Sequence, residues 1–401
     1  MSCVKSTALD RIDQQDTADK VPFRRRPRLA AADRRRGAAA VFGLILMVSL
    51  VVLVAITLDF SYIHVGETEM MRTADSAAMA GCWDLFEQKK GRSEVFPQET
   101  LVHSEANRFS QMNLVGNDAL TLADVGDVEL GTYRAHQPGV FDQSNPLAFN
   151  AVRVTLRRQA ATNGELPLFF GGITGRDTQS LQTVATAAML TAIEGFYAPE
   201  AGEDNLEILP FALDLPSWLD TIAGNTDDNY NGLTSNVTSG SDGVCETNLY
   251  PKGTGSPGNR GTVDIGGNNN STNDIARQIV YGISAQDMQD LGKPLKFDAN
   301  GELELNGDTG ISAGVKDELA SIIGQTRIIP IYTQVAGNGN NAMYTIVRFE
   351  GVRILDVKLT GKKTGKHLTI QPANVVARNV RIDYTGNQSS SHLFAPVMLV
   401  D

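Results

Sequence analysis

The chain is poor in the residues that most often carry chemistry. Its 401 residues include only three cysteines and five histidines. The histidines show no pairing at i, i+4 and no partner cysteine at metal-ligand spacing, so no zinc motif can be recognised. Cys82 and Cys245 could form one disulfide or stay free, while Cys3 lies apart. We therefore expect no bound metal and no cofactor.

Catalytic motifs are missing as well. No Gly-x-Ser-x-Gly occurs, and Glu302 and Glu304 alternate on one expected strand, where paired carboxylates usually face solvent. Residues 253–258 read G-x-G-x-x-G, but the prolines at 251 and 257 interrupt the strand and helix that a phosphate-binding loop requires. We predict that the chain is not an enzyme and has no small-molecule substrate. A triad built from distant residues stays open, because triads are defined by geometry.

One acidic segment has half of a metal motif. The run from Asp227 to Gly232 matches the first half of a calcium loop, in which short oxygen-bearing side chains converge on the ion. Thr238 occupies the twelfth position, where the bidentate glutamate belongs. An ordinary Asn/Gly turn is the simpler interpretation, and calcium binding near Asp227 is left open.

Basic residues are scarce in most of the sequence. From Asp59 onward, 25 Lys and Arg face 41 Asp and Glu, a net charge of −16. Nucleic-acid surfaces are basic, so we expect no nucleic-acid partner. The basic residues gather instead near the amino terminus, where positions 17–36 hold eight of them.

Those basic residues precede a run of 22 uncharged residues at 37–58. As a helix rising about 1.5 Å per residue, such a run spans about 33 Å, enough to cross a bilayer. Thirteen of its residues are Leu, Ile, Val or Phe. Basic residues are retained on the cytoplasmic side, so we predict a single-pass inner-membrane protein with a cytoplasmic amino terminus and an extracytoplasmic remainder. A cleavable signal peptide is the alternative, but its apolar core is normally shorter.

The helical pattern continues beyond the run to about residue 90. Small residues lie on one stripe there, at i, i+3, i+4 and i+7: Ala74, Ala77, Ala78 and Gly81. Small side chains let another backbone approach closely, so these four are candidate partner contacts. Packing against the chain's own domain is the favoured alternative, because a long exposed stripe would promote aggregation.

Several segments share features with one bacterial family. They are RRRGAAAVF at 34–42, TADSAAMA at 73–80, AVRVTLRR at 151–158, LPLFF at 166–170 and VATAA at 184–188. Together they resemble the TadE/TadG-like membrane proteins of the tight-adherence, or Flp pilus, assembly system. The resemblance covers about half of the chain, and the remainder reads as a carboxy-terminal extension specific to one branch. It implies a role in Flp pilus assembly, with other Tad/Flp assembly proteins as partners.

Two departures from related proteins narrow that resemblance. Pilins and TadE-type pseudopilins have a glutamate five residues after the processing glycine, whereas this chain has Phe42 five residues after Gly37. A fixed TadG-type anchor is therefore favoured over a released filament subunit. Some TadG relatives also carry an Asp-x-Ser-x-Ser metal site, but here Pro146 replaces the second serine of the run from Asp142. We therefore do not expect this chain to share the metal-dependent adhesion of those relatives.

We predict an α+β protein: a transmembrane helix that continues into an extracytoplasmic helix, then a mixed α+β region, then a β-rich carboxy-terminal domain. The expected divisions are 1–36, 37–62, 63–90, 91–195, a Gly/Asn-rich loop region at 196–273, and 274–401. Expected helices are 97–112, 166–173, 273–282, 284–291 and 313–323, and expected strands are 125–133, 151–158, 181–191, 326–334, 342–359 and 367–377. An Asn-Gly hairpin turn is expected at 297–303, a cap at Asn273 and a bulge at Gly351.

The predicted function is structural. We expect a membrane-anchored component of Flp pilus assembly that acts by protein contacts. A membrane-tethered binding or adhesion module is the alternative, and a tethered hydrolase is a distant third.

Overall fold

The computed structural model describes residues 33–89, 96–251, 260–266, 271–337, 339–362 and 365–400. The basic tail up to residue 32 and the glycine motif at 253–258 lie outside these residues. The chain divides into two compact units, residues 1–57 and 58–401.

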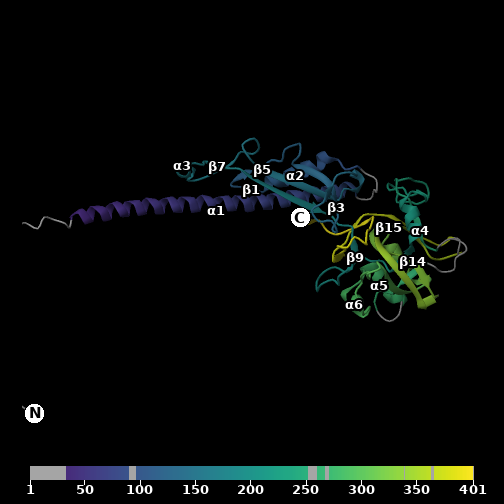
Figure 1. Ribbon diagram of the computed structural model, residues 1–401. Helices are drawn as coiled ribbons and strands as arrows, with labels where there is room; N and C mark the ends of the chain where they lie inside the picture. Colours follow the sequence, from purple (N-terminus) through teal and green to yellow (C-terminus); the bar gives the residue numbers. More distant parts are fainter. Residues whose placement is uncertain are drawn as a thin grey trace, which may run out of the picture. The chain divides into compact units, whose positions relative to one another are not determined.

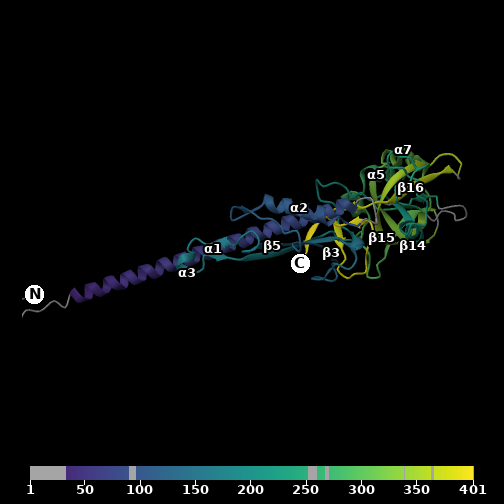
Figure 2. The same ribbon diagram turned by 90° about the horizontal axis from the view of Figure 1, so that it is seen from above.

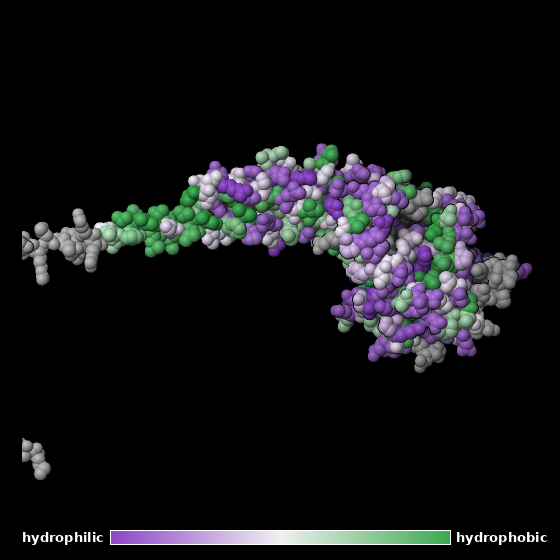
Figure 3. All heavy atoms as spheres, viewed as in Figure 1, coloured by the Kyte–Doolittle hydropathy of each residue, from purple (hydrophilic) through white to green (hydrophobic). Residues whose placement is uncertain are grey.

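The first element is the long helix α1 (Asp33–Lys89). In the first unit its apolar side chains are exposed: Phe42 is 74% and Leu46 71% accessible. Figure 3 shows this stretch as a continuous hydrophobic surface. It is the one helix in the described residues that is long and apolar enough to cross a membrane. The structure thus confirms a single amino-terminal apolar helix of membrane-spanning length, continued to residue 89.

The second unit begins with the later turns of α1, which pack on an antiparallel sheet of order β20-β8-β5-β3-β4. Its strands are β3 (Val128–Tyr133), β4 (Phe141–Asp142), β5 (Ala151–Arg158), β8 (Leu181–Ala188) and β20 (Met398–Val400). The helix α2 (Glu99–Met112) lies beside α1 in both views (Figures 1 and 2). Val102 and Ala106 of α2 share one buried core with α1 and with Val152 of β5.

The small-residue stripe of α1 faces this core. Ala74, Ala77 and Ala78 are completely buried. A Cβ added to Gly81 would lie 3.2 Å from Val152 Cγ1 and 3.3 Å from Val102 Cγ1. In the described chain the four candidate partner contacts are therefore buried, and Gly81 lies against Val152 of β5 and Val102 of α2. A partner could reach them only if those elements moved away.

The carboxy-terminal part of the second unit is built on seven strands in the order β11-β16-β15-β13-β12-β10-β14, with β14 also paired to β15. The strands are β10 (Phe211–Asp214), β11 (Thr247–Tyr250), β12 (Gly261–Val263), β13 (Leu303–Asp308), β14 (Thr326–Ala336), β15 (Ala342–Lys358) and β16 (His367–Pro372). Since β14 contacts both β10 and β15, five of them close into a ring. Only the β10–β14 pairing is parallel.

Alternating side chains fill both faces of this ring. One hydrophobic cluster on the ring contains a buried residue from each of the five strands: Ala212, Val263, Leu305, Tyr332 and Tyr344. The opposite face packs under helices α4 (Leu215–Ile222), α5 (Thr272–Tyr281) and α7 (Lys316–Ser321), in a second cluster with Phe211, Leu213, Ile329 and Ile331. Period-two alternation is what a sheet covered on two sides requires.

Short elements complete the unit. They are β1 (Leu114–Val115), β2 (Asp118–Ala119), β6 (Leu166–Pro167), α3 (Gly171–Thr174), β7 (Thr178–Gln179), β9 (Ile193–Phe196), α6 (Ala285–Asp290), β17 (Val375–Val376), β18 (Val380–Ile382), β19 (Leu393–Phe394) and the 3-10 turns Pro146–Ala148, Ala313–Val315 and Gly339–Asn341. Strand β9 pairs with β18, and β8 with β20. The order confirms an α+β protein with a long amino-terminal helix and a β-rich carboxy-terminal part.

Some expected elements differ. The helix expected at 166–173 is the short strand β6 followed by the four-residue helix α3. The expected loop region contains α4 and the ring strands β10 and β12. Ser271, not Asn273, caps α5. Gly351 is no bulge, because it pairs in register with Ile328.

Gly351 is required for a different reason. A Cβ there would lie 2.3 Å from the carbonyl oxygen of Ala373 and 2.4 Å from that of His392. The glycine thus allows two backbone segments to cross the middle of β15 at close range.

Candidate functional site

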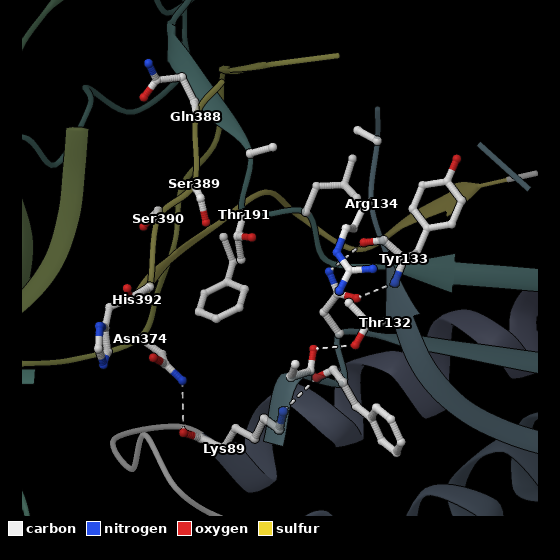
Figure 4. Close-up of a pocket in the computed structure, with 18 of the residues that line it drawn as sticks. Lys89, Thr132, Tyr133, Arg134, Thr191, Asn374, Gln388, Ser389, Ser390 and His392 are labelled. Carbon is white, nitrogen blue, oxygen red and sulfur yellow. Dashed lines mark hydrogen bonds between the residues drawn. The ribbon is translucent and has the colours of Figure 1, made fainter. Parts of the chain in front are cut away.

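One cavity, of about 540 Å³, is lined by segments distant in sequence. It gathers Lys89 at the end of α1, Thr132 of β3, Arg134 just after β3, and the loop from Gln388 to His392 (Figure 4). Its size is that of a small-ligand site, about 300–1,000 Å³.

The charged groups of this cavity are all basic. Lys89, Arg134 and His136 line it, and its described lining contains no Asp or Glu. Lys89 Nζ donates to the carbonyl oxygens of Leu147 at 2.9 Å and Phe149 at 2.7 Å. Burial lowers the pKa of Lys89 to about 8. Arg134 is itself paired with Asp142 at 3.2 Å, so the basic residues of the lining do not by themselves define an anion site.

A buried carboxylate accepts hydrogen bonds from the loop at 390–392. Glu350 of β15 is 0% exposed, and Oε2 accepts hydrogen bonds from Ser390 Oγ at 2.9 Å and from His392 N at 3.0 Å. Burial raises the pKa of Glu350, against the opposing effect of these bonds. The carboxylate therefore fixes the loop that forms one wall of the cavity.

His392 is buried in the same loop. Its ring packs edge-on against Trp218 of α4, with centroids 5.5 Å apart, and burial lowers its pKa to about 4. The imidazole is thus neutral near pH 7. Ser390 Oγ donates to Glu350 rather than to an imidazole, so this loop does not present the serine–histidine pair of a hydrolase.

Three acidic residues form a cluster in the chain segment that connects α4 to β11. Asp228, Asp242 and Glu246 each bring a carboxylate oxygen to within 4.8 Å of the others. The half calcium motif supplied one of them, Asp228. Sequence reasoning missed Asp242 and Glu246, which lie 14 and 18 residues further along; acidic residues repeated in one turn-rich segment were the available signal.

The two described cysteines are free. Cys82 is buried and Cys245 is half-buried, and no disulfide joins them in the structure. Of the two alternatives, the free thiols are the one observed. Burial raises the pKa of the Cys82 thiol to about 12, which makes it an unreactive core residue.

Comparison with known proteins finds two family matches in the amino-terminal part of the chain. Residues 37–84 match the family described as putative Flp pilus-assembly TadE/G-like, and residues 77–187 match putative Tad-like Flp pilus-assembly. The two matches run from α1 through β8 and so cover the long helix and most of the first sheet. No match was found among curated proteins or solved structures. Residues 37–187 are therefore similar to TadE/TadG-like proteins of Flp pilus assembly, as the resemblance in the sequence led us to expect.

Proposed function

We propose that the chain is a single-pass protein of the bacterial inner membrane that takes part in Flp pilus assembly by contacting other assembly proteins. The two family matches over residues 37–187 carry this proposal. The apolar part of α1 supports the anchor, and the eight basic residues at 17–36 support a cytoplasmic amino terminus.

The way α1 is used supports a fixed anchor. The same helix contains the apolar run and Met70, Ala77 and Leu85, which are buried in the core of the second unit. Pulling α1 away would therefore unfold that core. Phe42 occupies the position at which filament subunits have a glutamate, and this also favours a fixed anchor. We infer that the folded region works tethered, with its surface available to partners.

The topology is tested with cysteines. One variant carries Cys82→Ser and Cys245→Ser and so keeps only Cys3. The other also carries Cys3→Ser and has a single introduced cysteine, Leu233→Cys, at a position that is 98% exposed. A membrane-impermeant maleimide should label the Leu233→Cys variant in intact spheroplasts and the Cys3 variant only after permeabilisation. The reverse pattern would show the opposite orientation, and labelling of neither before lysis would place both sites inside.

The assembly role is tested in the native host. Deleting the gene should abolish surface pili, and the full-length chain should restore them. Photocrosslinkers at exposed positions of the second unit should capture proteins of the pilus-assembly system. Normal piliation of the deletion strain would contradict the proposal.

A further inference from the structure

In the described residues, no ion pair joins a basic side chain to the acidic cluster of Asp228, Asp242 and Glu246, which lies in the segment between α4 and β11. Glu246 is 6% exposed, and each of the three groups has a carboxylate oxygen within 4.8 Å of the others. Three carboxylates this close repel one another unless a proton or a cation lies between them.

Backbone hydrogen bonds hold the three groups in place. Glu246 Oε1 accepts from Tyr230 N at 2.8 Å, and Glu246 Oε2 from Asn229 N at 2.8 Å. Asp228 Oδ1 accepts from Asp242 N at 3.1 Å. A carboxylate has about four lone-pair sites, so each group can still bind an ion. The fold thus orients the oxygens in advance.

A buried amide from a separate element contacts the cluster. Gln371 lies on β16, is 1% exposed, and its Nε2 donates to Asp242 Oδ2 at 3.3 Å. Its carbonyl oxygen Oε1 is buried without a hydrogen-bond partner in the described residues. An unpaired buried amide oxygen is destabilising. It is also a ligand that hard cations accept.

We propose that Asp228, Asp242 and Glu246, together with the amide oxygen of Gln371, bind a divalent cation of the calcium type. Only oxygen ligands are present, which favours calcium over zinc or copper. Water and backbone carbonyl groups would complete the coordination of six to eight oxygens that calcium takes. This is not the calcium loop suggested by the sequence around Asp227, because two of the carboxylates come from beyond that loop.

Such an ion would join two distant parts of the chain. Asp228, Asp242 and Glu246 belong to the turn-rich segment between α4 and β11, whereas Gln371 belongs to the seven-stranded sheet. Calcium would therefore stabilise the folded unit and its turn-rich surface together, independently of the role in pilus assembly.

The test uses the full-length protein in detergent, stripped with EGTA and titrated with calcium chloride by calorimetry, with thermal unfolding in parallel. Wild type should bind one ion and unfold at a higher temperature with calcium. Asp242→Asn should weaken binding at least about tenfold. The control Asp220→Asn removes the same charge from an exposed position on α4 and should bind as wild type.

Gln371→Met, which keeps the volume and removes the oxygen, provides an independent check if Asp242→Asn does not fold. It too should bind calcium more weakly. The proposal is overturned if wild type gives neither heat nor a temperature shift, if Gln371→Met and the folded Asp242→Asn bind as wild type, or if Asp220→Asn loses binding to the same extent.

Discussion

Asp59 and Phe170 lie 111 residues apart, and Asp59 Oδ1 accepts a hydrogen bond from Phe170 N at 3.1 Å. The same oxygen accepts from Phe169 N at 3.0 Å. The first charged residue after the apolar run is thus 4% exposed and holds the segment before α3 against α1.

Asp59→Ala should lower the free energy of unfolding by about 1.5–3 kcal/mol, because two backbone donors lose a charged acceptor. Glu67→Ala is the control, since this exposed carboxylate of α1 pairs only with the exposed His64 in the described chain. Denaturant unfolding in detergent measures both. Equal effects would show that the bonds of Asp59 add nothing to stability.

Gly81→Leu should destabilise the second unit by about 1–3 kcal/mol, because the added atoms would overlap the side chains of Val102 and Val152. Met79→Leu on the exposed side of α1, where Met79 is 41% accessible, should be nearly neutral. Thermal unfolding distinguishes the two. A stable Gly81→Leu protein would mean that the stripe of small residues is not core.

Arg260→Met should cost about 3–5 kcal/mol of stability, because it leaves a buried carboxylate without its cation. Arg260 Nε lies 2.7 Å from Asp214 Oδ2, and both side chains are 6% exposed. Arg134→Met breaks an exposed pair with Asp142 and should change the stability little, because water and salt screen such pairs. Urea unfolding checks the difference, and similar losses would contradict the assigned burial.

The stability should also depend on pH through His392. Its folded pKa is about 4 against an ordinary value of 6.5, so between these values the unfolded chain binds more protons. This contribution is fully present above pH 6.5, falls as the pH drops through the window and is lost below about 4, a change of about 3 kcal/mol.

His392→Phe keeps an aromatic ring against Trp218 and removes the titration. Its free energy of unfolding should therefore fall less than that of wild type between pH 7 and pH 4. Parallel profiles for wild type and His392→Phe would exclude the contribution.

The sequence pattern was sufficient to predict an element where that element was long and its hydrophobic periodicity was clear. The alternation in β5 gave bounds that the structure reproduces, and the apolar run predicted the amino-terminal part of α1. Strands β10 and β12 were not predicted because they have four and three residues between turn-rich segments, too few to show a period. Their place in the ring depends on pairing with strands from distant parts of the chain.

The candidate sites were hidden for a related reason. Glu350 reads as an ordinary polar position of an alternating strand, yet it is buried because Ser390 and His392, about 40 residues later, satisfy its oxygens. Gln371 reaches Asp242 across 129 residues. Neither contact leaves a trace in local spacing, so no single-sequence motif could reveal them.

The pairing of β20 with β8 has a consequence for engineering. Met398, Leu399 and Val400 cover the edge of β8 at Ala188, Ala187 and Thr186. Without those three residues, β8 would offer unpaired amide and carbonyl groups to any free strand, including one donated by a neighbouring copy. Shortening the protein by a few residues at this end would thus invite strand exchange between molecules.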